Sequence, residues 1–351
     1  MKKLKVAIVG CGRVSRMYKQ AFQDLSNRVT VVNAVDTDFK KAQLFAREFS
    51  GCSPQKNYQE ILNKDLDVIH LATPHHLHAP MAIESMERDI NVLTEKPMAI
   101  TLQEADRMIA VAEKEGVKLG VIFQTRYVKG CIDLKKIIES GKLGKLKSAR
   151  SYLSWMRTEE YYNNSDWKGT WDKEGGGVLI DQAIHSIDRV QWLIGSQPKW
   201  IKGHIDNRVH DSYKVEDVAE AFVRFENECL YQLYACNCYS YNAPIEIEIA
   251  GERGQVGLKQ DLAWVDLEGE SYYEIKEGYD GLFVGPSYWG CSHLTQIKDF
   301  YNSVINDQEV LVDGREGRKS LELVRGIYNS AVRGKKVCLP FTDELIYEIP
   351  E

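Results

Sequence analysis

KVAIVGCGRVS, residues 5–15, joins a short apolar, β-branched run to a glycine-rich turn. The amphipathic spacing that follows, from residue 15 to about residue 25, predicts a helix. In such a strand–turn–helix unit, Gly10 permits the tight turn, and Gly12 lets backbone N–H groups approach a pyrophosphate at the helix N-terminus. Ser15 takes the place of the usual third glycine or alanine and is small enough for close helix–sheet packing. We expect a dinucleotide to bind this turn, with contacts from Gly10, Gly12, Arg13 and Val14.

Asp36 follows the next apolar run, Val29–Val35. A carboxylate at this position accepts hydrogen bonds from the adenosine ribose 2′-OH. It would also repel a 2′-phosphate, and the neighbouring Thr37 and Asp38 offer no cation. The sequence therefore favours NAD over NADP as the cofactor. The alternative interpretation is a turn aspartate that merely caps a helix.

Up to residue 125, short apolar runs alternate with amphipathic helical patterns, which is typical of βαβ units and a parallel sheet. After it come long alternating runs, among them Gln255–Leu267, that predict antiparallel strands with one packed face. Helical patterns accompany these runs at Gly130–Ser140, Val178–Leu193, Leu294–Asn306 and Arg315–Gly334. A chain of 351 residues suits two domains. We expect an α/β Rossmann domain over 1–125 and an α+β domain with a large open, mainly antiparallel sheet over 126–351.

The composition argues against several classes of protein. With 44% hydrophobic residues, 27% charged residues and a formal net charge of −6, the chain resembles a folded acidic enzyme. It has no basic footprint for nucleic acid or for an anionic membrane. The N-terminal apolar run, about five residues, is short for a signal peptide, and no stretch approaches the ~18–20 apolar residues of a membrane span. We therefore expect a cytoplasmic protein.

Two further segments follow apolar runs of the predicted parallel sheet, Thr73-Pro74 and Glu95-Lys96-Pro97. Loops at the carboxyl edge of such a sheet meet a bound dinucleotide. The expected cofactor-binding residues therefore also include Thr73, Pro74, His78, Glu95 and Lys96. The histidines around residue 76 lack the carboxylate or cysteine companions of a transition-metal site, so we expect no metal.

GGGVLIDQAIH, residues 175–185, places a carboxylate and an imidazole on an otherwise apolar helix after a glycine loop that we expect to be flexible. Asp181 and His185 are four residues apart, so their side chains share one helical face, about 6 Å apart. Buried titratable groups need partners. An internal Asp–His hydrogen bond is the structural alternative to a catalytic pair.

Taken in this order, these motifs resemble those of the Gfo/Idh/MocA family (glucose-fructose oxidoreductase, inositol dehydrogenase and rhizopine catabolism protein). The resemblance covers essentially the whole chain. It is carried by the glycine turn at Gly10–Ser15, Ala72-Thr73-Pro74 with His78, Glu95-Lys96-Pro97, Asp166-Trp167-Lys168, and the glycine loop with Asp181 and His185.

The resemblance implies reversible hydride transfer between a nicotinamide and a carbon that bears a secondary alcohol, with Lys96, Asp181 and His185 as catalytic residues. His185 would take the hydroxyl proton, Lys96 would stabilise the developing alkoxide, and Asp181 would orient a substrate hydroxyl or the imidazole. Either His185 or Lys96 could be the formal base. The resemblance also implies a homodimer or homotetramer that pairs through the open sheet.

Aromatic and polar residues gather in the segments expected to bind substrate. Aromatic faces suit the C–H faces of pyranose rings, and Arg, Asp and His side chains meet hydroxyls, although core packing is the alternative for any single aromatic. The candidate substrate residues are Arg126, Tyr127, Trp155, Arg157, Trp167 and His293, with Tyr161, Trp171 and Trp289 as further aromatics. We expect a pyranose, glycoside or inositol as substrate, with C3 of a hexopyranosyl group as the preferred site of oxidation.

Two other functions stay open. A redox-neutral enzyme that cleaves a glycoside, or eliminates a group through a 3-keto sugar, would use NAD transiently and keep the same residues. A non-catalytic dinucleotide-binding regulator is expected to lack Lys96, Asp181 or His185, and all three are present.

Overall fold

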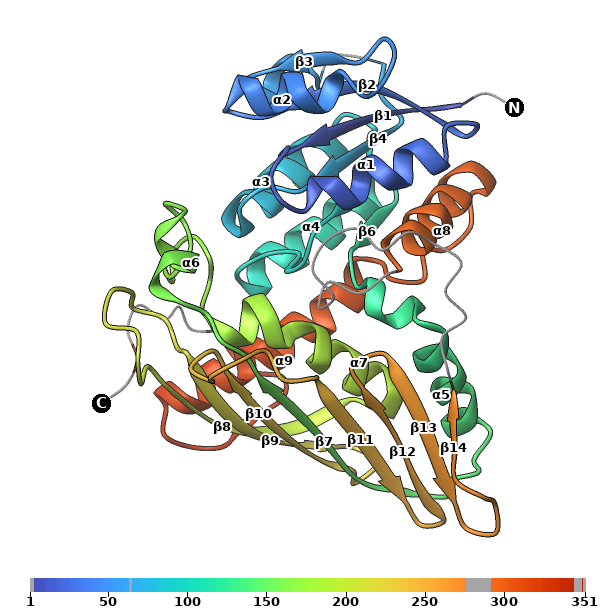
Figure 1. Cartoon of the computed structure of the whole chain (residues 1–351), viewed down its shortest axis with the longest axis vertical. Coiled ribbons are helices and arrows are strands. Elements are labelled where there is room, and N and C mark those ends of the chain that lie inside the picture. Colours follow the sequence, from blue (N-terminus) through green and yellow to red (C-terminus); the bar gives the residue numbers. More distant parts are fainter. Residues whose placement is uncertain (1–2, 63–64, 276–291, 344–348, 350–351) are drawn as a thin grey trace. The chain divides into compact units, whose positions relative to one another are not determined.

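The computed structural model describes residues 3–62, 65–275, 292–343 and 349, which form two compact units (Figure 1). The first unit lies within Met1–Gln124 and Gly281–Arg318, and the second within Thr125–Asp280 and Lys319–Glu351. Helix α9 (Gly314–Val332) begins in the first unit and ends in the second. Of the helices described, none is both long and apolar enough to cross a membrane.

The sheet of the first unit is parallel and has the strand order β3-β2-β1-β4-β5-β6. The strand order reverses between β1 and β4, and open α/β sheets bind ligands at such a switch point. The strands are β1 (Leu4–Val9), β2 (Val29–Val35), β3 (Ser53–Gln55), β4 (Val68–Leu71), β5 (Asn91–Thr94) and β6 (Leu119–Val121). The helices between them are α1 (Ser15–Asp24), α2 (Phe39–Ala46), α3 (His75–Met86) and α4 (Leu102–Glu115), with the short turn η1 (Tyr58–Glu60). The predicted Rossmann fold is confirmed.

Local sequence explains the ends of α4. The Thr101 hydroxyl accepts the Glu104 N–H at 3.2 Å, and the Glu104 carboxylate accepts the Thr101 N–H at 3.2 Å, which makes a capping box. Gly116, with φ 69°, ends the helix in the left-handed conformation that glycine adopts at little cost. The sequence pattern alone locates both ends of this helix.

Helix α8 (His293–Asn306) belongs to the first unit, whereas the division at residue 125 assigns it to the second. Its side chains Ile297, Phe300 and Tyr301 lie in the hydrophobic core formed with β1 and α1. The Tyr301 hydroxyl also lies 2.7 Å from Nε2 of His70 on β4. An amphipathic pattern identifies the buried face of a helix but not the sheet that covers it, so the return of this helix to the first unit was not predictable from periodicity.

The sheet of the second unit has nine strands in the order β14-β13-β12-β11-β7-β10-β9-β8-β15, and its pairs are antiparallel except for β7 with β10. Helix α7 (Ile184–Ile194) packs on β7 and β11, and α5 (Lys129–Glu139) packs on β12 and β13. The large, mainly antiparallel sheet expected from the sequence is confirmed. Its strands are β7 (Leu146–Ser154), β8 (Pro198–Asp206), β9 (Val218–Phe225), β10 (Leu230–Cys236), β11 (Glu246–Gly251), β12 (Gly254–Lys259), β13 (Leu262–Leu267), β14 (Tyr273–Ile275) and β15 (Val337–Cys338).

The run Gln255–Leu267, expected as one strand, is a hairpin of β12 and β13. The chain reverses at Gln260, whose φ is 54°. Alternation of apolar and polar residues continues through the reversal, so the pattern conceals it. The sequence analysis also did not identify the short elements η2 (Gln124–Tyr127), α6 (Glu159–Asn163), β14 and β15.

Candidate active site

Gly10 and Gly12 shape a backbone cradle where β1 ends. Gly10 has φ 95°, and a Cβ there would lie 2.3 Å from the carbonyl oxygen of Ala72, so only glycine fits. A Cβ at Gly12 would meet no atom within 4 Å. No side chain caps the first turn of α1. An open cradle before uncapped N–H groups is the arrangement that binds a pyrophosphate.

Asp36 is held by backbone on both of its oxygens. The Cys11 N–H donates to Oδ2 at 2.9 Å, and the Asp38 N–H donates to Oδ1 at 2.8 Å. The hydroxyl oxygen of Thr73 is buried and has no hydrogen-bond partner among the described residues. An oriented carboxylate, an open cradle and an unsatisfied hydroxyl together fit a dinucleotide.

His78 and Glu95 lie inside the first unit and support its loops. The His78 ring is fully buried, with Nδ1 2.7 Å from the Pro97 oxygen and Nε2 2.8 Å from the Thr73 oxygen. Burial lowers the pKa of this imidazole to about 4, against the two carbonyl oxygens, which raise it. The Glu95 carboxyl accepts the Tyr18 hydroxyl at 2.9 Å, and burial raises its pKa. The side chains of both residues tie together the segments that flank Lys96. Their contact with the cofactor stays a prediction.

Asp181 and His185 are the two solvent-accessible residues in an otherwise buried segment. Every residue from Glu174 to Gln191 is buried except these two, which are half-buried. Asp181 lies in a π-helical turn, Leu179–Ala183, which leads directly into α7, where His185 is the second residue. π-Helical turns occur frequently at functional sites. The four-residue spacing therefore exposes one carboxylate and one imidazole together.

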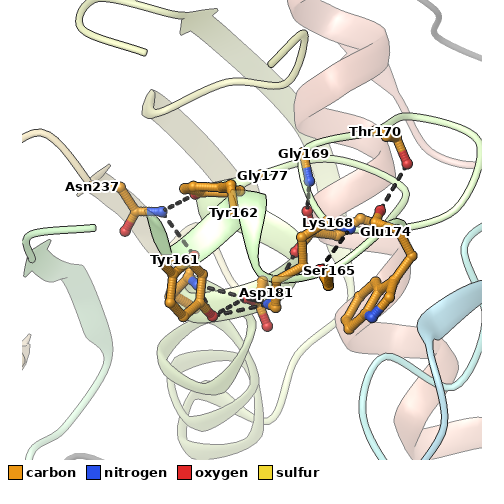
Figure 2. A network of polar contacts seen from close by, with 12 residues as sticks. Tyr161, Tyr162, Ser165, Lys168, Gly169, Thr170, Glu174, Gly177, Asp181 and Asn237 are labelled. Carbon is orange, nitrogen blue, oxygen red and sulfur yellow. Dashed lines mark hydrogen bonds and ion pairs between the residues drawn. The ribbon is translucent and has the colours of Figure 1, made fainter. Parts of the chain in front are cut away.

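The Asp181 carboxylate is the centre of a polar network (Figure 2). Its Oδ2 accepts three hydrogen bonds, from the Tyr161 hydroxyl at 2.8 Å, the Lys168 ammonium at 2.7 Å and the Gln182 amide at 2.6 Å. The Gln182 amide is itself oriented, because Asn237 donates to its oxygen at 2.9 Å. Charged and neutral donors on one oxygen stabilise the ionised carboxylate.

The start of the π-helical turn is held by Glu216. This carboxylate accepts the N–H groups of Gly177 at 2.9 Å and Leu179 at 3.0 Å, and also the Tyr328 hydroxyl at 2.7 Å. Burial raises its pKa to about 7. Glu216 thereby fixes the backbone from which Asp181 projects.

Several predicted substrate residues gather around Tyr161. The Arg157 guanidinium lies 4.7 Å from the centroid of a Trp155 ring and 5.1 Å from that of Tyr161. The Lys168 ammonium lies 4.5 Å from the Tyr161 centroid and 4.7 Å from that of Trp167. These are cation–π distances. Four residues of the predicted wall, together with Lys168, therefore form one connected cluster beside Asp181: Trp155, Arg157, Tyr161 and Trp167.

The chain matches two family profiles. Residues 4–123 match the oxidoreductase family with an NAD-binding Rossmann fold, and residues 132–257 match the Gfo/Idh/MocA C-terminal domain. The chain belongs to the Gfo/Idh/MocA oxidoreductase family. The fold and the cofactor class, NAD, agree with this membership.

Similar members of the family act on or bind ring compounds. D-Glucoside 3-dehydrogenase of Escherichia coli is 24% identical over 95% of this chain and 97% of its own. A 1-carboxy-3-chloro-3,4-dihydroxycyclohexa-1,5-diene dehydrogenase of Comamonas testosteroni is 27% identical over 73% of this chain, and the match spans only 63% of that protein. The WlbA dehydrogenase of Bordetella pertussis, crystallised with NADH and UDP-GlcNAcA, is 28% identical with a TM-score of 0.85 over 97% of this chain and 100% of its own.

Not every residue expected at the Gfo/Idh/MocA substrate site is placed there. Arg126 is buried and forms a two-point ion pair with Asp188, at 2.8 and 2.6 Å. His293 is buried at the start of α8, and burial lowers its pKa to about 4. Both side chains therefore have structural surroundings within their own units. Tyr127 is half-buried in η2, and Trp289 lies outside the described residues.

Three network members escaped assignment from the sequence. Lys168 belongs to the family-like Asp166-Trp167-Lys168 motif, but the motif gives it no role. Gln182 and Asn237 are polar residues in apolar runs, and their burial is the signal that they need partners. Two buried amide side chains predict a hydrogen-bond network, but the sequence does not show which carboxylate accepts their hydrogen bonds.

Proposed function

We propose that this protein is an NAD-dependent dehydrogenase that oxidises a secondary alcohol on a six-membered ring, a sugar or a cyclitol. The observation that carries the proposal is that Asp181 and His185 are both partly accessible to solvent in an otherwise buried helix. Three donors orient the Asp181 carboxylate. A fixed acceptor beside an imidazole is what removal of an alcohol proton requires.

Each catalytic residue has a distinct task. Asp181 accepts a substrate hydroxyl and orients the reacting carbon. His185 takes the proton of the reacting hydroxyl, as a neutral imidazole within reach of the substrate can. Lys96 donates to the developing alkoxide. NAD, when bound, supplies the hydride acceptor; Gly10, Gly12, Asp36 and Thr73 would hold it.

The names of the relatives support a ring substrate. One is a glucoside dehydrogenase acting at C3, one acts on a dihydroxylated carbocycle, and one was crystallised with a sugar nucleotide. The common element is a secondary hydroxyl on a six-membered ring. Within this class we propose C3 of a hexopyranosyl group as the preferred site, in line with the glucoside 3-dehydrogenase, which is 24% identical over 95% of this chain.

The test is NADH formation on a panel of pyranoses, glycosides and inositols. Turnover of at least one compound is expected, with a fall of about 10²–10⁴-fold in His185→Ala if the imidazole is the base. His204→Ala, an exposed histidine of β8, is the matched control. No NADH from any compound, together with release of an aglycone, would replace the proposal by redox-neutral glycoside cleavage.

A further inference from the structure

Lys168 is a nearly buried ammonium between two carboxylates. Its side chain is 15% exposed, and Nζ lies 2.7 Å from Oδ2 of Asp181 and 3.3 Å from Oε1 of Glu174, whose side chain is fully buried. A buried cation needs ionised or strongly polar partners to offset its desolvation. Lys168 therefore draws both carboxylates toward one point (Figure 2).

Glu174 anchors this arrangement to the backbone. Its Oε2 accepts the N–H of Gly169, the residue next to Lys168, and its Oε1 faces the ammonium. These contacts join the two ends of the segment from Lys168 to Glu174. The protein therefore holds the ammonium in place without a substrate. Asp181 is the partner on the open side, with 11% of its side chain exposed.

Tyr161 completes the set. Its hydroxyl oxygen accepts a hydrogen bond from the Lys168 ammonium at 2.9 Å, and its O–H donates to Oδ2 of Asp181 at 2.8 Å. With a cation donating to it and a carboxylate accepting from it, this hydroxyl has one orientation. Burial raises the pKa of Tyr161 to about 12, so it stays a donor at working pH.

We propose that Lys168, anchored by Glu174, is the positioning residue that holds Asp181 as an oriented carboxylate and so lets it accept a substrate hydroxyl. The inference rests on the proposed function and goes beyond it, because it gives a role to a residue outside the catalytic set. Lys168 acts through Asp181 and Tyr161 and need not touch the substrate.

The test compares Lys168→Met, which removes the charge at similar length, with Lys168→Arg, which keeps it. For the full-length protein with NAD and the best substrate of the panel, Lys168→Met should lower kcat/KM by about 10²-fold, as expected for a displaced catalytic group. The acidic limb of its pH profile should move to higher pH, because the carboxylate form of Asp181 loses its cation. Lys168→Arg should restore much of the activity and the wild-type limb, and binding of NADH should be unchanged in both.

The control is Lys199→Met, which breaks an exposed ion pair with Glu228 in the same unit. It should leave kcat/KM and the pH profile as in the wild type. A double-mutant cycle of Lys168→Met with Asp181→Asn, followed by thermal unfolding, should give non-additive shifts in Tm. Additive shifts would overturn the pairing.

The outcomes separate the two proposals. If the wild type turns over a substrate and Lys168→Met keeps its kcat/KM and its acidic limb, the role of Lys168 is wrong and the dehydrogenase stands. If Lys168→Met only lowers Tm, the residue is structural and the inference is again wrong. If the wild type turns over none of the panel, the dehydrogenase proposal fails, and the double-mutant cycle in Tm then decides whether Lys168 holds Asp181.

Discussion

A side chain at Gly177 would place its Cβ 2.0 Å from the carbonyl oxygen of Glu216. At Gly176, a Cβ would lie 2.0 Å from the hydroxyl oxygen of Tyr328. The same Glu216 holds the N–H of Gly177 and the hydroxyl of Tyr328 through its carboxylate. The glycine loop, expected to be flexible, is therefore a close-packed junction, and its lack of side chains lets Glu216 reach the turn that carries Asp181.

Gly177→Ala should consequently lower both stability and turnover. Backbone cannot move aside as the tip of a side chain can, so we expect a loss of about 2–3 kcal/mol in the free energy of unfolding, as for other overpacked sites. The control is Gly269→Ala, where φ is 80° but an added Cβ meets nothing within 4 Å. That change should cost only about 1 kcal/mol. A loss in denaturant unfolding no larger than that of Gly269→Ala would show that contact with Glu216 is not what requires glycine at 177.

The pH dependence of stability should show the titration of Glu216. Burial raises its pKa to about 7, above the value of about 4.3 in an unfolded chain. The folded protein thus binds the extra proton between these values, and stability contributed by this group is present at low pH and lost as the pH rises through about 7. The loss corresponds to about 4 kcal/mol.

Glu216→Gln does not titrate, so the stability advantage of the wild type over this variant should shrink by that amount between about pH 4 and about pH 8. Unfolding in urea at several pH values measures the difference. Glu87→Gln, at an exposed position at the end of α3, is the control. A difference that stays constant with pH would contradict the elevated pKa of Glu216.

The fold was largely predictable because most of its elements carry their signals locally. Val29–Val35 and Val218–Phe225 are strands with the bounds that their apolar patterns indicate; the first is buried on both faces only toward its end, and the second alternates. The placement of α8 was not predictable, because Ile297 and Phe300 fit any apolar surface until the chain is folded. Which helix packs on which sheet depends on contacts between distant segments, and no single segment of sequence determines it.

The site was predictable only in part, for a related reason. Asp181 and His185 stand out as polar residues on an apolar helix, and the structure exposes both. Lys168, which follows α6, and Gln182, in the π-helical turn, both donate to Asp181, and their spacing in the sequence follows no simple period. The π-helical turn also interrupts the 3.6-residue repeat of the helix. Sequence patterns locate polar and charged side chains but do not show which oxygen accepts their hydrogen bonds.

Gln182→Glu should disturb Asp181 without changing the size of the side chain. It replaces a donor to Oδ2 by a second carboxyl group, and neighbouring carboxylates disfavour ionisation of each other. We expect the acidic limb of the kcat/KM profile to move to higher pH, with about a tenfold loss at pH 7. Gln103→Glu, exposed on α4, should show no such change. An unshifted limb would mean that the amide of Gln182 does not influence the carboxylate.

Asp36 should determine the choice between NAD and NADP. Asp36→Ser removes a charged acceptor for a ribose hydroxyl, so the dissociation constant of NADH should rise about tenfold or more. NADPH should bind more tightly than before, because the repulsion of its 2′-phosphate is gone. Asp24→Ser, at the end of α1, is the matched control, and fluorescence titration with NADH and NADPH gives two dissociation constants for each protein. Asp36 also accepts the N–H groups of Cys11 and Asp38, so a purely structural aspartate would weaken both cofactors alike. Equal losses for NADH and NADPH would therefore identify Asp36 as a support of the glycine turn, whereas opposite changes would establish it as the residue that selects NAD.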